Sequence, residues 1–484
     1  MSGIIGSKLN IRGSGIVAQL GTDGQVLTSA GAGVAAEYED VAAGISWQSV
    51  ETGSTMTAVA GNGYPINTTS NTCTITLPSS ASAGDTIIFA DYARTWATNK
   101  IIIDSNGLNY QGDDDTFTVE YTTAGQSLHI TYMDSTKGWV PTLDDDVTDV
   151  PVEPKQGIFG YGSTGSGVSM SNLVSGTGVV GTDVSGVGTD RSHLAACEYG
   201  DDKGIFGFGQ NPVTGSLTGI TNLVNNSGVI ATDVSGVGTA RANLTACSYG
   251  GDKGIFAYGN SGSFTAISNL VSNTGVVGTD VSGVGTARSG SGGCEYSADK
   301  DKGIFRGGYS GSPQNASNLV SNTGVVSTDV TGVGTATWNT AAADYGEDKG
   351  IFGYGESYIS ISNLISNTGV VASDTTGVGT ARASLAACEW GSDRAIFGYG
   401  YTGSQVSMTN LVNSSGVVAT DTTGVGTARY QLAATQYGGD KGIFGYGEAP
   451  LTAITNLVSN TGVVGTDVTG VGTGRASLAA CSYN

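Results

Sequence analysis

The segment DKGIFGYG, residues 440–447, decides the fold of this 484-residue chain, because close copies of it return at a nearly constant interval. The seven copies of GIFGYG begin at Gly157, Gly204, Gly254, Gly303, Gly350, Ala395 and Gly442. Successive copies start 45 to 50 residues apart, and the last copy runs to the C-terminal Asn484. A constant period of this length predicts a repeat architecture in which each copy is one supersecondary unit.

Each repeat contains four strand-like segments separated by turn residues. Around the seventh copy these segments are LAATQY (432–437), GIFGYG (442–447), ITNLVS (454–459) and GVVGTDVTGV (462–471). The turns GGDK and SNTG separate them, and such Gly- and Asn-rich turns join antiparallel strands. Four strands in such a period are typical of a propeller blade, whereas the coils of a solenoid are shorter.

The two ends of the repeat region complete one another. The first copy starts at GIFGYG without a preceding Arg-to-Tyr strand, and the chain ends in such a strand, RASLAACSYN, at residues 475–484. We therefore predict an all-β, seven-bladed β-propeller over 157–484, whose first blade takes its innermost strand from 475–484. This closure would leave no exposed sheet edge, which would otherwise template aggregation.

The repeated order R-x-x-L-A-A-x-x-Y-G-x-D-K-G-I-F-G-Y-G resembles the kelch repeat of β-propellers over 157–484. It departs from the kelch pattern because the fourth strand lacks the usual Trp, and because the kelch diglycine appears only as Gly307-Gly308 or as the spaced G-Y-G. The resemblance implies a kelch-like blade and carries over no kelch activity.

The residues before the repeats divide into three parts. Residues 1–46 are rich in Gly, Ser and Ala, which predicts a thin arm or shaft. Residues 47–143 contain β-branched and aromatic runs between turn residues, which predicts a small β domain. Residues 144–156, DDDVTDVPVEPKQ, combine acidic clusters with prolines, which is typical of an exposed, fairly stiff linker.

Two segments of this N-terminal half resemble tailed-bacteriophage fibre proteins. LGTDGQVLTSAGAG (20–33) is similar to a linker common in these proteins, and TCTITLPSSASAGDTIIFADYARTWATNKIIIDSNG (72–107) is similar to a β module of tail fibres. The resemblance implies a structural virion protein that is attached to other tail or capsid proteins through its N-terminus and is often homotrimeric. It also implies that the C-terminal domain faces a host cell-surface glycan or protein.

Composition excludes several other functions. Lys and Arg number 20 against 41 Asp and Glu, and a net charge of −21 repels nucleic acid. No apolar run is long enough to span a membrane, and the N-terminus has too short an apolar stretch for a secretory signal. We therefore expect the chain to be made in a cytosol. The resemblance to fibre proteins implies that it is assembled in the host cytoplasm and is finally located in the virion.

Enzymatic, cofactor and metal chemistry are also disfavoured. Only two histidines occur, His129 and His193, and they lie in different predicted domains. The motif GYGSTG (160–165) is not followed by a helix that could hold a dinucleotide pyrophosphate. A polysaccharide-degrading spike would need paired carboxylates in one cleft. We expect no enzyme activity, no cofactor and no metal.

The leading function is host-receptor recognition by a tail fibre, and the alternative is a purely structural head fibre or tail spacer.

One face of the propeller is the predicted receptor face. Strand direction alternates within a blade, so the loop after GIFGYG and the turn from GVG into the repeat Arg share a face. This loop varies in length and chemistry between copies, whereas the DK and SNTG turns barely change. It carries the receptor-face candidates Asn211, Phe264, Tyr309, Tyr358 and Tyr401. Aromatic faces beside amides and hydroxyls suit sugar and protein ligands, although loops under no constraint would also vary.

Two other sets recur in the repeat. Arginines occur at Arg191, Arg241, Arg288, Arg382, Arg429 and Arg475, with Thr337 in the fourth copy, and aspartates occur at Asp183, Asp233, Asp280, Asp329, Asp374, Asp421 and Asp467. Each Arg follows an Asp by eight residues, which predicts a carboxylate–guanidinium staple in or between blades. The alternative is an arginine collar that binds an anion.

Small residues occupy another constant position of the repeat: Cys197, Cys247, Cys294, Ala343, Cys388, Thr435 and Cys481. We expect these on the innermost strands, the cysteines as free thiols.

Overall fold

The computed structural model describes residues 44–113, 118–144, 155–330 and 332–483, together with five short N-terminal strands. The chain is all-β and forms two compact units, Met1–Glu153 and Pro154–Asn484. The division falls inside the predicted linker 144–156, most of which lies outside the described residues. No helix of the described chain is long and apolar enough to cross a membrane.

Five short strands lie within the predicted arm, residues 1–46. They are β1 (Gly3–Ile5), β2 (Lys8–Ile11), β3 (Gly15–Gln19), β4 (Gln25–Thr28) and β5 (Glu37–Asp40). The first three form an antiparallel sheet in the order β1-β2-β3, and β4 pairs with β5.

The rest of the N-terminal unit consists of two sheets. The five-stranded sheet has the order β14 (Trp139–Asp144), β13 (Ser127–Tyr132), β10 (Thr86–Asp91), β8 (Asn62–Ile66) and β6 (Ser46–Trp47). The four-stranded sheet has the order β12 (Val119–Tyr121), β11 (Ile101–Asp104), β9 (Cys73–Thr76) and β7 (Thr55–Thr57). From β6 to β11 the chain alternates between the sheets, so strands that are neighbours in sequence lie in different sheets.

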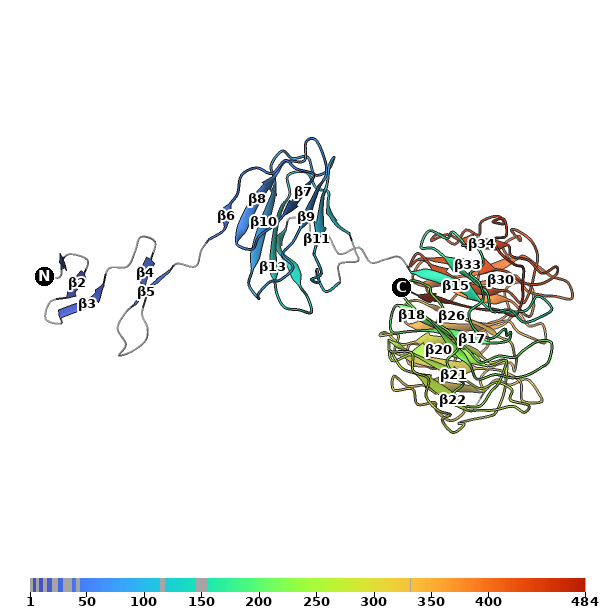
Figure 1. The fold of residues 1–484 in the computed structure, drawn as a ribbon. Helices are drawn as coiled ribbons and strands as arrows, with labels where there is room; N and C mark the ends of the chain where they lie inside the picture. The colour runs from blue at the N-terminus through green and yellow to red at the C-terminus, as the bar shows by residue number, and fades with distance from the viewer. Residues whose placement is uncertain are drawn as a thin grey trace. The chain divides into compact units, whose positions relative to one another are not determined.

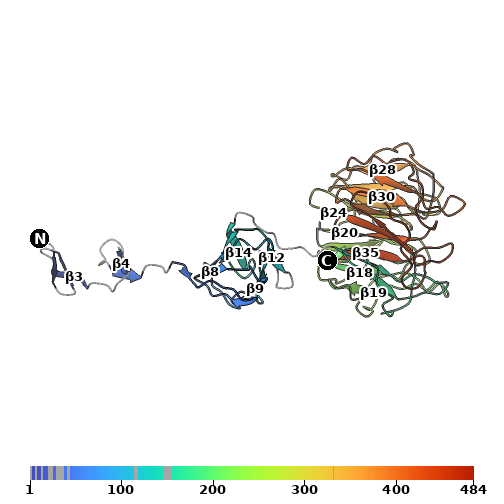
Figure 2. The same ribbon diagram turned by 90° about the horizontal axis from the view of Figure 1, so that it is seen from above.

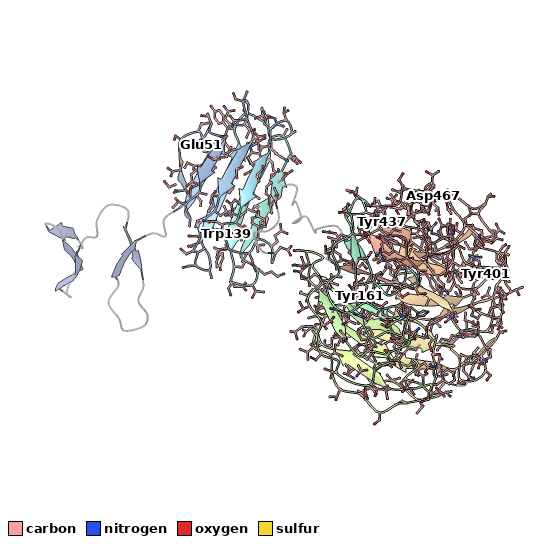
Figure 3. The ribbon with its side chains drawn as sticks, turned by 45° about the vertical axis from the view of Figure 1, so that its right-hand side comes forward. Glu51, Trp139, Tyr161, Tyr401, Tyr437 and Asp467 are labelled. Carbon is pink, nitrogen blue, oxygen red and sulfur yellow. The ribbon has the colours of Figure 1, made fainter. Side chains whose placement is uncertain are left out.

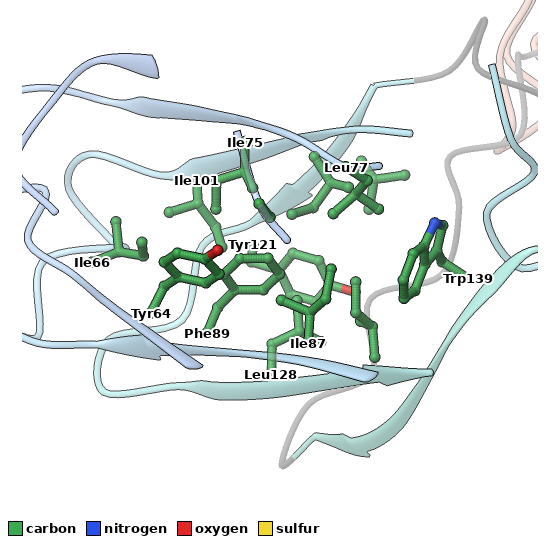
Figure 4. Close-up of a cluster of buried hydrophobic side chains, with 14 of the residues drawn as sticks. Tyr64, Ile66, Ile75, Leu77, Ile87, Phe89, Ile101, Tyr121, Leu128 and Trp139 are labelled. Carbon is green, nitrogen blue, oxygen red and sulfur yellow. The ribbon is translucent and has the colours of Figure 1, made fainter. Parts of the chain in front are cut away.

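This winding produces parallel pairing, as between β8 and β10 and between β9 and β11. Each of these strands turns alternate side chains inward, because the side-chain period of a strand is two residues. Ile75 and Ile101 of one sheet meet Phe89 and Leu128 of the other in a core that is closed at one end by Trp139. Figure 4 shows these side chains between the two sheets. Sequence reasoning predicted the β domain but not its parallel, alternating winding.

The C-terminal unit contains seven three-stranded antiparallel sheets, which Figures 1 and 2 show side by side. Their first strands are β17 (Ala195–Tyr199), β20 (Thr245–Tyr249), β23 (Gly292–Tyr296), β26 (Ala341–Tyr345), β29 (Ala386–Trp390), β32 (Ala433–Tyr437) and β35 (Ala479–Tyr483). Their middle strands are β18 (Lys203–Gly207), β21 (Lys253–Ala257), β24 (Lys302–Arg306), β27 (Lys349–Gly353), β30 (Arg394–Gly398), β33 (Lys441–Gly445) and β15 (Gln156–Gly160). Their third strands are β19 (Thr221–Val224), β22 (Ser268–Val271), β25 (Ser317–Val320), β28 (Ser362–Ile365), β31 (Thr409–Val412), β34 (Thr455–Val458) and β16 (Ser171–Val174).

Six of these sheets are built from consecutive strands, and the seventh joins the two ends of the unit. There β35 pairs with β15 from Gln156↔Tyr483 to Gly160↔Ala479, and β15 pairs with β16. The middle strands are buried on both faces, which is why the apolar GIF run continues without alternation. Each first strand lies against the first strand of the next sheet, and β35 lies against both β32 and β17.

The predicted fourth strand is not a strand in the structure. In the sheet that joins the two ends of the unit, the segment after β16 makes only two isolated bridges, Val174↔Val180 and Ser171↔Val184. Between them, the side-chain amide of Asn172 donates to the Gly181 carbonyl at 3.1 Å. A side chain on the third strand therefore takes a hydrogen-bond acceptor of this segment, and no regular ladder forms.

Adjacent sheets interlock through the small residue of the first strand. A Cβ added to Gly254 would lie 2.6 Å from the Sγ of Cys197 on the preceding sheet, so the Gly of GIF makes room for the thiol. Where the preceding strand has Ala343 instead of Cys, the middle strand has Ala395 instead of Gly, and the two alanines share one buried cluster. At this pair the small residue and the Gly change together because they fill one interface, whereas Thr435 still faces a Gly, Gly157.

All six cysteines are free and buried. Burial raises the pKa of the Cys388 thiol to about 12. A thiol with such a pKa stays protonated at neutral pH, and only the thiolate is nucleophilic. These cysteines therefore act as small apolar side chains.

Candidate functional site on the loop face

Each repeat Arg is a fully buried side chain between two sheets. Arg382 lies over the ring of Tyr354 from the preceding sheet, 4.1 Å from its centroid. In its own sheet it donates from Nη2 to Asn410 Oδ1 at 2.7 Å, from Nε to the Tyr399 carbonyl at 2.8 Å and from Nη1 to the Thr380 carbonyl at 3.1 Å. The guanidinium thus ties neighbouring sheets together. A collar open to anions is wrong, because these groups are 0% exposed.

The predicted Arg–Asp staple forms in three sheets, but its Asp is not the one eight residues before the Arg. Arg288 lies 3.7 Å from Asp329, Arg382 lies 3.9 Å from Asp421 and Arg475 lies 4.0 Å from Asp183. The partner comes after the third strand of the same sheet as the Arg, whereas the Asp eight residues earlier belongs to the preceding sheet. Sheet stacking, rather than distance along the chain, selects the partner.

The carboxylates are held mainly by hydrogen bonds. Asp183 accepts from Thr473 Oγ1 at 2.7 Å and from Asn172 Nδ2 at 3.0 Å. Partial burial raises its pKa, but these hydrogen bonds and the charge of Arg475 outweigh burial and hold the pKa below its ordinary value. Equivalent bonds hold the same pKa shift at the Asp of every other sheet: Asp233, Asp280, Asp329, Asp374, Asp421 and Asp467.

The fourth copy replaces its missing Arg from another position. Thr337 stands where the other copies have Arg, and Gly307 stands where they have an aromatic residue. Arg306 on β24 is 1% exposed, donates to the Val333 carbonyl at 3.0 Å and contributes a favourable charge to Asp374. Thr337, Gly307 and Arg306 all depart from the repeat pattern, and Arg306 supplies the guanidinium that the Thr337 position lacks.

A central cavity of about 260 Å³ lies among the first strands. The residue after each small residue of the first strands lines it: Glu198, Ser248, Glu295, Asp344, Glu389, Gln436 and Ser482. Lys155 Nζ lies 2.9 Å from Glu198, and Lys300 Nζ lies 3.9 Å from Glu389. Burial, followed by the charge of Glu198, raises the pKa of Glu295 to about 7. Sequence reasoning missed this set, although its constant place after the small residue could have revealed it.

The shifted pKa of Glu295 predicts a pH-dependent stability. Its folded-state pKa exceeds its ordinary value of 4.5, so the unfolded chain releases the proton more readily and stability falls as pH rises from about 4.5 to 7. Burial and the charge of Glu389 raise the pKa of Asp344, which lowers stability over the same rise in pH.

We expect Glu295→Gln to raise the thermal midpoint at pH 8 by about 2–4 °C and to leave it nearly unchanged at pH 4.5. Calorimetry of the full chain measures both values. The exposed Glu347→Gln is the matched control, and an equal pH slope in Glu295→Gln and the parent contradicts the prediction.

The loop face consists of the loops between middle and third strands and the residues that lead into the first strands. The lead-in and the loop meet at isolated bridges such as Ser289↔Tyr309 and Ala383↔Tyr401. Four of the five receptor-face candidates lie in two aromatic groups here. Phe264 lies 5.8 Å from Tyr309 between ring centroids, and Tyr358 lies 6.4 Å from Tyr401. Tyr358 is 46% exposed, and Tyr401 is labelled at the periphery of the unit in Figure 3.

Two further aromatic residues complete these groups. Trp338 lies 5.4 Å from Tyr309, and Tyr430 lies 5.2 Å from Tyr401. Both follow the repeat Arg position, where the other copies have Ser or Ala. The comparison between repeats could have found them through this change from small to aromatic. We call Phe264, Tyr309 and Trp338 the first triad, and Tyr358, Tyr401 and Tyr430 the second triad.

Asn211 does not join the triads. Its Oδ1 accepts from the backbone of Val213 at 2.9 Å and from that of Thr214 at 3.0 Å, so the side chain shapes its own loop. It remains half-buried in the loop of the sheet that contains β18.

Inside the triads, one residue of each sheet forms a polar axial ring. Its members are His193, Asn243, Gly290, Asn339, Ser384, Gln431 and Ser477. Each has a positive φ, and six of the seven successive pairs are joined by a backbone hydrogen bond, such as Asn339 N to Gly290 O at 2.7 Å and Gln431 N to Ser384 O at 3.0 Å. The pair Asn339 and Ser384 has no such bond. Trp338 and Tyr430 directly precede two ring members. The triads are therefore attached to a hydrogen-bonded backbone rather than to isolated loop tips.

No known family model matches this chain, and no curated protein matches it.

Proposed function

We propose that the C-terminal unit is a seven-bladed, kelch-like β-propeller closed by β35. The pairing of β35 with β15 supports closure, because it joins the two ends of the unit in one sheet. The contacts between first strands support a circular arrangement, because they run through all seven sheets and return to β17. Six backbone hydrogen bonds between members of the axial ring follow the same order, and only the pair Asn339 and Ser384 lacks one.

We propose further that the protein is a bacteriophage virion fibre that recognises a host receptor through this propeller. The resemblance of residues 20–33 and 72–107 to tail-fibre segments supports the virion location and attachment through the N-terminus as a homotrimer. The proposal of receptor recognition rests on one observation, the two aromatic triads on the most variable loops. Solvent-accessible aromatic residues grouped on one face mark binding surfaces, whereas single exposed residues do not.

The combined variant Phe264→Ala, Tyr309→Ala, Tyr358→Ala and Tyr401→Ala tests this function. We expect it to melt within about 5 °C of the parent, because none of these side chains is fully buried, and to adsorb to host cells at least about tenfold more weakly, because truncated interface anchors cost about 2 kcal/mol or more. Adsorption of purified protein and competition with infection are the measurements.

A matched control removes apolar surface elsewhere on the same unit. Val179, Val229, Val276 and Val325 are 61–67% exposed and lie outside the loop face. Their combined change to Ala is expected to leave adsorption unchanged. Parent-like adsorption by the aromatic variant, in virions that assemble normally, would contradict recognition by this face and favour the structural alternative.

A further inference from the structure

The loop face combines two kinds of contact at neighbouring positions. Stacking surfaces come from the triads, and polar groups come from the exposed amides of Asn243, Asn339 and Gln431 and from half-buried hydroxyls of the axial ring. Ser477 Oγ donates to Gln431 Oε1 at 3.2 Å, which orients that amide. A sugar ring presents C–H groups on its face and hydroxyls on its rim, so it needs both contacts at such spacing.

The charges on the loop face narrow the class of sugar that it can bind. The exposed or half-buried cations of the C-terminal unit lie away from the loop face: Lys203, Lys253, Lys302, Lys349, Arg394 and Lys441 begin the middle strands at the opposite ends of the sheets, and Lys155 and Lys300 line the central cavity. The arginines that lead into the first strands are fully buried. Among its described residues the loop face presents no Lys or Arg to solvent, whereas it carries Asp190, Glu356 and Glu448. An anionic sugar would meet like charge here without a compensating cation.

The arrangement of the triads favours a polymer. The first triad comes from β21–β22, β24–β25 and the lead-in to β26, and the second comes from β27–β28, β30–β31 and the lead-in to β32. Glu356 lies next to the backbone of the first triad, because its N–H donates to the Trp338 carbonyl at 2.8 Å. Its carboxylate accepts from Ser384 at 3.1 Å, and Ser384 follows Ala383, which forms a bridge with Tyr401 of the second triad. Two stacking platforms divided by polar groups fit successive residues of a saccharide chain better than one continuous apolar protein patch.

We propose that the loop face binds an uncharged polysaccharide of the host surface, with sugar rings stacked on the two triads and hydroxyls bonded to the axial ring. This inference rests on the proposed recognition function and adds the class of the ligand. Trp338 is expected to be in direct contact with the sugar.

The test uses the full chain and deproteinised host surface polysaccharide, separated by ion exchange into uncharged and acidic fractions. We expect the uncharged fraction to compete with adsorption to cells and to change the Trp338 fluorescence. The pairs Tyr309→Ala with Trp338→Ala and Tyr401→Ala with Tyr430→Ala should each weaken binding of this fraction at least about tenfold. The valine control should bind like the parent, and Trp338→Phe should retain binding while losing the fluorescence change.

The other outcomes separate the two proposals. Competition by the acidic fraction alone overturns the inference and leaves recognition intact. The same holds if neither fraction competes while protease treatment of the cells abolishes adsorption, because the ligand is then a protein. If the protein does not adsorb to host cells at all, the proposed recognition function is wrong. Direct titration of the protein with dextran, mannan and galactan then tests polysaccharide binding by itself. Binding that is tenfold weaker in the triad variants supports the inference, and no binding by the parent overturns it.

Discussion

Deletion of residues 475–484 is expected to lower the thermal midpoint of the C-terminal unit by about 15 °C. The deletion removes β35, which pairs with β15 along five residue pairs. It also removes the buried side chains of Cys481 and Tyr483 and the Arg475 bonds to the carbonyls of Tyr161 and Phe159. A buried apolar side chain contributes about 1.5–3 kcal/mol and a net hydrogen bond about 1 kcal/mol, so the loss is several kcal/mol.

The loss has a second consequence, because β15 becomes an unpaired sheet edge that can recruit other chains. Removal of Asn484 alone is the matched control, since β35 ends at Tyr483. Calorimetry of the full chain measures the midpoint, and light scattering measures association. Addition of the peptide RASLAACSYN should restore part of the midpoint. A truncated chain that melts like the parent would disprove the closure scheme.

Arg382→Leu is expected to destabilise the C-terminal unit by about 3–5 kcal/mol, because removal of one buried partner leaves the others unpaired. Asn410 Oδ1 and the carbonyls of Tyr399 and Thr380 would lose their donor, and Asp421 would lose its nearby charge. At about 2 °C per kcal/mol for a unit of this size, the midpoint should fall by about 6–10 °C.

Two variants give this prediction its contrast. Arg382→Lys keeps the charge but cannot reproduce the planar fork of donors, so we expect an intermediate midpoint. Arg394→Leu removes an Arg that is 41% exposed and lies 3.4 Å from Asp393. Such surface pairs contribute about 0–1 kcal/mol, so this variant should melt within about 2 °C of the parent. Equal midpoints for Arg382→Leu and Arg394→Leu would contradict the structural role of the buried guanidinium.

Much of the fold follows from local sequence patterns. The GIF repeat predicted the middle strands, the position of the small residues predicted the first strands, and RASLAACSYN predicted a strand that pairs with the first copy. These features are local because strand alternation, continuous burial and turn residues are encoded within a few neighbouring positions. Four of the five candidates on the loop face also lie in the triads for a local reason, since strand direction determines which loops share a face.

Contacts between sheets could not be obtained in this way. The Asp eight residues before each Arg looked like its partner, but stacking places the Asp of a later segment beside the guanidinium. The predicted fourth strand does not form, because the side-chain amide of Asn172 donates to the Gly181 carbonyl, which a β-ladder would use as an acceptor.

The amino-acid sequence by itself determined the repeat, the all-β class and the pairing of the last strand with the first copy. Only the tertiary structure decided which side chains meet across sheets. It joined Trp338 and Tyr430 to the aromatic triads, bonded the Arg306 guanidinium to the Val333 carbonyl, and wound β6 to β11 alternately through two sheets. The physical reason is that strand and turn preferences act over a few residues, whereas packing depends on the distances between sheets, which spacing along one chain does not contain.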